Sequence, residues 1–103
     1  MSMLAEFSVV PIGKNVSISP VIAQVMKVVV DSGVSYKANA MGTVLEGDWD
    51  AVMGVIRKCH EVVMKDAERV LTSVTIDDRK GKEQRIEKKL ESVEQKLGMK
   101  LKR

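Results

Sequence analysis

Residues 39–50, NAMGTVLEGDWD, concentrate side chains that could do chemistry. Asn39 and Thr43 offer hydrogen-bond donors and acceptors, and Glu46 offers an anionic acceptor for an amine or a ring nitrogen. Gly42 permits a close approach to the backbone because it has no side chain. This combination predicts recognition of a small polar or cationic molecule.

Part of this segment also has a purely structural interpretation. Gly42 suits a turn, Asp48 is a good N-cap residue, and Trp49 can pack at the start of a helix. We therefore interpret residues 47–50 mainly as a helix start. A strand-end Glu46 between apolar neighbours is not explained in this way, so the functional interpretation is retained for residues 39–46.

Catalytic and metal sites find less support in the sequence. Cys59 and His60 are adjacent, so on a helix their side chains point in different directions, and zinc needs three or four ligands. Glu6 and Glu46 could do acid–base work if their pKa values were split, but no nucleophile or oxyanion loop accompanies them. No Walker A, GxGxxG or HExxH motif is present. We expect no enzyme, no metal and no cofactor beyond a bound ligand.

Hydrophobic periodicity predicts the elements that must position these residues. Alternation in MLAEFSVVPI predicts a strand ended by Pro11 and Gly13, with Met3, Ala5, Phe7 and Val9 on its buried face. Apolar residues at helical spacing and their caps predict three helices. The expected order is strand 3–10, helix 19–33, strands 34–40 and 43–47, helix 48–67, strand 70–77 and helix 83–98.

The order β-α-β-β-α-β followed by a helix predicts an α+β, ferredoxin-like sandwich. Its four-stranded antiparallel sheet would carry two helices on one face. We expect one domain, with residues 1–80 as the ligand-binding core and residues 81–103 as a basic C-terminal helix used in oligomerisation.

The sheet face without helices should be of mixed character, neither a core nor a fully polar surface. It would carry the other half of each alternation: Leu4, Glu6, Ser8, Val10, Leu71, Ser73 and Thr75. The last helix adds a narrow apolar seam, which consists of Ile86, Leu90, Val93 and Leu97. Such surfaces usually meet a ligand or a second copy. We predict a homo-oligomer, a dimer or a tetramer, with C2 dimers as its base unit.

Charge is distributed unevenly along the chain. Residues 79–103 carry ten basic side chains against four glutamates, a net +6, whereas the whole chain carries +3. This tail indicates either a solvated helix face or a surface for an acidic partner. Only three aromatic residues are present, so few side chains could stack on bases, and we do not expect nucleic acid as a partner. The alternative function is a structural or regulatory assembly module whose basic helix contacts a macromolecule.

The expected location is the cytoplasm. Cys59 is the only cysteine, so no internal disulfide can form, which fits a reducing compartment. The N-terminus shows no secretory signal, and no apolar run approaches the roughly 20 residues of a membrane span.

The chain resembles the small thiamine-binding protein family over about residues 3–97. The resemblance lies in VVPIG, SISPVIA, MGTVLEGDWDAVMGVIRKCHE and RVLTSVTIDDR. Its most specific part is the T-x-x-E-G core formed by Thr43, Glu46 and Gly47.

This resemblance implies a ferredoxin-like protomer that forms dimers and tetramers through its sheets and C-terminal helices. It also implies binding of thiamine or its hydroxymethylpyrimidine portion without catalysis. The ligand-binding residues carried over by position are Ser17, Asn39, Met41, Gly42, Thr43 and Glu46.

Overall fold

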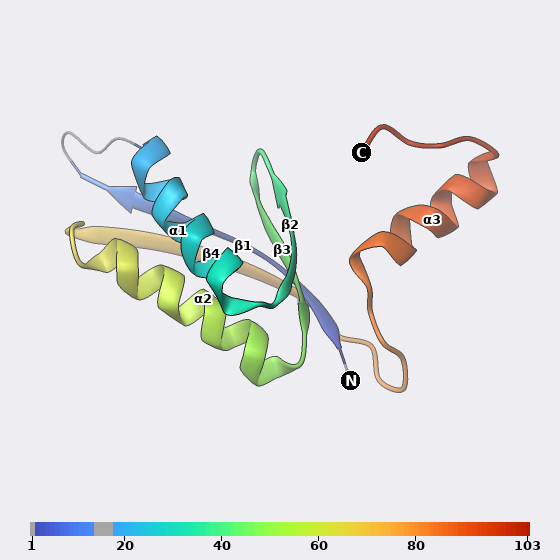
Figure 1. Ribbon diagram of the computed structural model, residues 1–103, viewed down its shortest axis with the longest axis horizontal. Helices are drawn as coiled ribbons and strands as arrows, with labels where there is room; N and C mark the ends of the chain where they lie inside the picture. Colours follow the sequence, from blue (N-terminus) through green and yellow to red (C-terminus); the bar gives the residue numbers. More distant parts are fainter. Residues whose placement is uncertain (1, 14–17) are drawn as a thin grey trace.

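The computed structural model describes residues 2–13 and 18–103, so the candidate Ser17 lies outside the described residues. The described part has the predicted order of helices and strands (Figure 1). The elements are β1 (Met3–Ile12), α1 (Ile18–Ser32), β2 (Ser35–Asn39), β3 (Gly42–Gly47), α2 (Trp49–Met64), β4 (Arg69–Asp77) and α3 (Ile86–Leu97).

The sheet is built around β1. This strand pairs antiparallel with β3 on one side and β4 on the other, and β2 completes the order β2-β3-β1-β4. Met3, Ala5, Phe7 and Val9 are all buried, which confirms the predicted inward face. The strand continues through Pro11 and ends at Ile12, directly before Gly13, so of the two residues expected to end it only Gly13 does. Pro11 lies where β1 pairs with β4 alone, so one side of the strand needs no ladder donor there.

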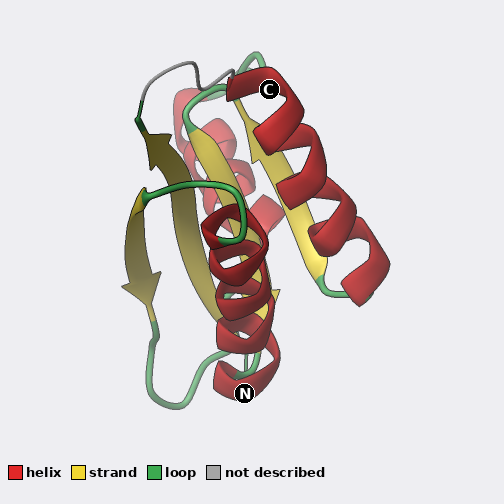
Figure 2. Ribbon diagram, turned by 90° about the vertical axis from the view of Figure 1, so that its left-hand side faces the viewer, coloured by secondary structure: helices red, strands yellow, loops and turns green. Residues whose placement is uncertain are grey.

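Helices α1 and α2 cover the inward face of the sheet and pack against each other (Figures 1 and 2). The core stripe of α2 includes Val52, Ile56 and Cys59, and α1 contributes Val25 and Val29. These layers form the ferredoxin-like α+β sandwich that the element order predicts. The face without α1 and α2 is called the open face below.

The ends of the helices differ partly from the predicted bounds. Asp48 is the N-cap of α2 as expected, with its Oδ1 accepting from the Ala51 amide at 2.8 Å. The helix stops at Met64 rather than Ala67, because the Asp66 amide turns back to the Val63 carbonyl at 3.3 Å. Gly98 ends α3 in the left-handed conformation, with φ of 76°.

Helix α3 starts later than predicted, at Ile86 instead of residue 83. Two hydrogen bonds hold the backbone of Gln84 against Ser2: the Gln84 amide donates to the Ser2 carbonyl at 3.2 Å, and Ser2 Oγ donates to the Gln84 carbonyl at 2.9 Å. These long-range bonds keep Gln84 outside the helix. Figure 1 shows α3 apart from α1 and α2, at the other end of the molecule.

Polar contacts attach α3 to the rest of the protein. No α3 residue is buried; Glu87 pairs with Lys37 of β2 at 3.6 Å, and Lys89 pairs with Asp77 of β4. No helix in the described ranges is both long and apolar enough to cross a membrane.

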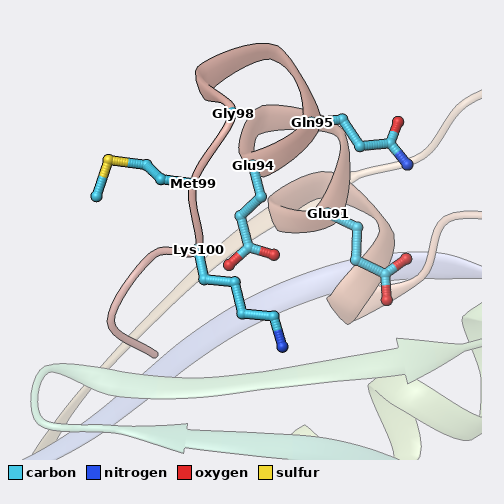
Figure 3. Close-up of a pocket in the computed structure, with 6 residues that line it drawn as sticks. All are labelled: Glu91, Glu94, Gln95, Gly98, Met99 and Lys100. Atoms are coloured by element: carbon cyan, nitrogen blue, oxygen red, sulfur yellow. The ribbon is translucent and has the colours of Figure 1, made fainter.

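Residues 99–103 fold back along α3 and bind Glu94. The Leu101 amide donates to Glu94 Oε2 at 2.7 Å, while Arg103 Nη2 donates to Oε1 at 2.9 Å. Arg103 also pairs with Glu87. Figure 3 shows Glu94 between the helix and this returning segment, beside a cavity of about 440 Å³. Only 11% of the Glu94 side chain is exposed, so these bonds are partly shielded from water.

We predict that replacing Arg103 with Ala releases the returning segment. Hydrogen bonds to a charged group contribute about 1.5–3 kcal/mol, so exchange of the Leu101 amide should accelerate about tenfold or more. Hydrogen exchange resolved by NMR measures this rate. Lys102→Ala is the control, and equal acceleration in both variants would contradict the assigned role of Arg103.

We also predict that Cys59 resists alkylation in the folded protein. Burial raises the pKa of its thiol to about 11, whereas an unfolded thiol has a pKa near 8.5. Iodoacetamide at pH 8 should react at least about 100-fold more slowly with the native protein than with the urea-unfolded chain, because the thiolate is the nucleophile.

The same shift predicts a loss of stability in alkali. The raised pKa in the folded state means that folding favours the neutral thiol. Its contribution to the free energy of unfolding is therefore fully present below the pKa of the unfolded chain, and it is lost as the pH rises towards 11. Urea unfolding between pH 8 and 11 should show a steeper loss for the wild-type protein than for Cys59→Ala. Parallel profiles would contradict the assignment.

Candidate functional site

The T-x-x-E-G core divides between the two faces of the sheet. Thr43 lies opposite Phe7 on the inward face, where it is 7% exposed and its hydroxyl is 3.4 Å from the Met26 sulfur. Glu46 lies on the open face, where Oε1 accepts from the Ser35 hydroxyl at 3.0 Å. Because side chains alternate along a strand, a spacing of three places the two residues on opposite faces. The structure does not bring Thr43 and Glu46 together.

Asn39, Met41 and Gly42 lie together at the β2–β3 hairpin. Asn39 is paired with Gly42, and Met41 is 89% exposed in the turn between the strands. A Cβ on Gly42 would lie 3.0 Å from the Phe7 carbonyl oxygen. Close packing of β3 on β1 therefore explains this glycine.

A shallow hollow on the open face contains one predicted residue, Met41. Its volume is about 60 Å³, and the residues lining it are Glu6, Phe7, Ser8, Met41, Ser73 and Thr75. These residues define the open-face hollow. The register places Ser8 opposite Ser73 and Glu6 opposite Thr75, so three hydroxyl groups and one carboxylate converge there.

Sequence reasoning did not select Ser8, Ser73 and Thr75 as site residues. The alternation of the two strands places them on the open face. No local motif marks them, because their convergence depends on the pairing of β1 with β4 and on the reach of the distant β2–β3 turn. The register of β1 against β4 is the signal that would have identified them.

The open face presents two carboxylates on neighbouring strands. Glu6 lies opposite Val44 and Glu46 opposite Leu4, so the two glutamates are diagonal neighbours, a relation that separates side-chain origins by about 7–8 Å. Lys37 lies on the same face, but it pairs with Glu87 of α3. Among residues 2–13 and 18–103, neither Glu6 nor Glu46 forms an ion pair, so this region favours a cationic ligand.

Cys59 and His60 have structural environments. Cys59 is buried with its sulfur 3.7 Å from the Val25 carbonyl oxygen, and His60 Nδ1 lies 2.6 Å from the Thr72 hydroxyl. Within the described ranges, no three His, Cys, Asp or Glu residues are grouped to hold a metal ion.

Comparison with known proteins identifies relatives across most of the chain. Residues 5–94 match a family model described as thiamine-binding protein. A UPF0045 protein of Methanocaldococcus jannaschii is 40% identical over 91 residues, covering 88% of this chain and 91% of the relative. The UPF0045 protein YqgV of Bacillus subtilis is 33% identical over 100 residues, covering 91% and 96%.

Solved structures agree with these relationships. The crystal structure of the M. jannaschii protein superposes with a TM-score of 0.83 at 39% identity, covering 89% of this chain and 95% of the other. A Thermotoga maritima protein proposed to act in thiamine biosynthesis or salvage has the same fold, with a TM-score of 0.79 at 20% identity and coverage of 90% and 99%. With the family model matching most of its length, this chain belongs to the thiamine-binding protein family.

Proposed function

We propose that this protein binds thiamine or a related aminopyrimidine on its open face, without catalysing a reaction. The observation that carries the proposal is the pair of carboxylates, Glu6 and Glu46, without ion-pair partners among the described residues and beside a hydroxyl-lined hollow. Membership of the thiamine-binding family supports the choice of ligand.

The chemistry of the open face matches an aminopyrimidine linked to a cationic ring. The exocyclic amine donates hydrogen bonds that a carboxylate accepts, and Ser73 and Thr75 can donate to ring nitrogens. The positive ring of thiamine is attracted by the second carboxylate. Met41 is exposed and flexible, so its side chain can settle against a flat ring without a fixed shape.

The size of the hollow suggests that a second copy completes the site. A volume of about 60 Å³ holds only one end of such a ligand, whereas small-molecule sites usually measure about 300–1,000 Å³. Val10 and Leu71 are exposed on the open face of the sheet, and Val93 and Leu97 are exposed on α3. A symmetric dimer or tetramer would bury this apolar surface and enclose the ligand.

The proposed role is that of a carrier, buffer or sensor in the cytoplasm. Buried Cys59 is a free thiol, which suits a reducing compartment. Binding without chemistry fits a role in which the ligand is held and released unchanged.

We predict that Glu46→Gln and Glu6→Gln each weaken binding about 10- to 100-fold. Removing a charge-assisted hydrogen bond costs about 1.5–3 kcal/mol. Calorimetric titration with thiamine and with hydroxymethylpyrimidine, on protein freed of small molecules, measures the affinity. No heat for either compound up to millimolar concentration would refute the proposal.

Two further variants serve as controls in that experiment. Glu61→Gln removes the same charge from α2, where Glu61 pairs with exposed Arg57, and should change affinity less than twofold. Thr43→Val alters a side chain on the inward face and should also leave affinity nearly unchanged. A large loss with Thr43→Val would place the ligand on the helix side of the sheet.

We predict that Leu71→Glu converts the oligomer to smaller species and weakens ligand binding. Leu71 is 52% exposed on the open face, and a buried unpaired carboxylate would oppose association. Sedimentation velocity should show dimers or tetramers for the wild type, with no change for Val30→Glu on the outer face of α1. An intact oligomer that binds no ligand would favour the alternative function, an assembly module.

A further inference from the structure

A second cavity lies where β4 leads into α3. Its volume is about 520 Å³, and the residues lining it are Asp77, Arg79, Lys82, Glu83, Gln84, Arg85, Lys88, Lys89 and Ser92. These residues define the β4–α3 cavity. It shares no residue with the open-face hollow, and its lining is basic where the open-face hollow is acidic.

The carboxylates of the β4–α3 cavity are already engaged by its own side chains. Asp77 accepts from Gln84 Nε2 at 3.2 Å through one oxygen and pairs with Lys89 through the other. Glu83 pairs with Arg85 at 3.2 Å.

Three cations remain around the same space: Arg79, Lys82 and Lys88. In the described part of the chain, none of the three forms an ion pair. Because the other charges of the lining cancel in pairs, the cavity carries an uncompensated charge of about +3.

The turn that carries these cations is held in place by backbone contacts. The Lys82 amide donates to the Arg79 carbonyl at 3.3 Å, and Gly81 adopts φ of 80°, a conformation that favours glycine. The two bonds between Ser2 and Gln84 fix the far end of the turn to the start of β1. The backbone around the cavity is therefore organised without a ligand, which lowers the entropic cost of binding one.

The start of α3 lies beside this cluster. Arg85 is the N-cap residue, and its side chain makes no capping hydrogen bond to the first-turn amides. These amides carry partial positive charge that favours an anion. Lys88 and Ser92 follow on the same helix and line the cavity with an ammonium and a hydroxyl.

We propose that the β4–α3 cavity binds the diphosphate or triphosphate group of a small molecule. One phosphate group carries a charge of about −1.5 to −2 near pH 7, so two linked groups balance three cations. This site is independent of the proposed ligand of the open face.

The charge around the cavity favours a discrete anion over a nucleic acid strand. Along the rest of α3 the positive surface is not continuous, because Glu91 is acidic and Glu87 and Glu94 pair with Lys37 and Arg103. No aromatic residue lines the cavity to stack a base.

The test is titration of the full-length protein with inorganic pyrophosphate, followed by calorimetry and by NMR shifts of backbone amides. We expect saturable binding with shifts centred on residues 77–92. The double variant Lys82→Gln/Lys88→Gln should weaken affinity at least tenfold. Lys27→Gln/Lys58→Gln removes the same charge from exposed positions on α1 and α2 and should change affinity less than twofold.

Three outcomes would overturn the proposal. Equal weakening in both double variants would indicate non-specific charge attraction, and shifts outside residues 77–92 would indicate another site. Stronger binding of a single-stranded oligonucleotide, with the steep salt dependence of many phosphate contacts, would indicate a nucleic-acid surface instead. Because thiamine contains no phosphate, titration with thiamine in the same variants tests the open face separately.

Discussion

The pairing of β1 with both β3 and β4 is the constraint on which the rest of the structure depends. It places the inward-facing side chains of β1 against α1 and α2, so that Phe7 and Ala5 join one core with Leu45. The same pairing places the outward-facing side chains of β1, β3 and β4 side by side on the open face. A slip of one residue would exchange the two faces, because side chains alternate with a period of two. Core and candidate site are therefore two consequences of one register.

The two faces use their polar residues in different ways. On the inward face, Thr43 is buried against Met26 and completes the packing below the hairpin. On the open face, Glu6 and Glu46 stay free of ion pairs within the described residues because Lys37 is drawn towards Glu87 of α3. Helix α3, which contacts β3, thereby influences the charge of this surface. The start of α3 carries basic residues that line the β4–α3 cavity, so this basic region is separate from the acidic open-face hollow.

Much of the fold was predictable because its determinants are local. The alternation of β1, the apolar stripe of α2 and the N-cap Asp48 each depend on neighbouring residues, and all three are found in the structure. The start of α3 was not predictable in this way. Ser2 holds Gln84 across 82 positions of sequence, and helical periodicity carries no information about such a contact. Pro11 within β1 was missed for a related reason, since the number of strands paired beside it is a tertiary property.

The sequence by itself determined the fold class, the family and a segment rich in polar groups, because each of these depends on residue types and on short spacings between them. The tertiary structure alone decided how that segment is divided. In a strand, Thr43 and Glu46 point to opposite faces, although they are only three residues apart. Strand pairing then placed Glu6, Ser73 and Thr75 beside the distant Met41. Residues converge through register and packing, and these depend on contacts that join parts of the chain far apart in sequence.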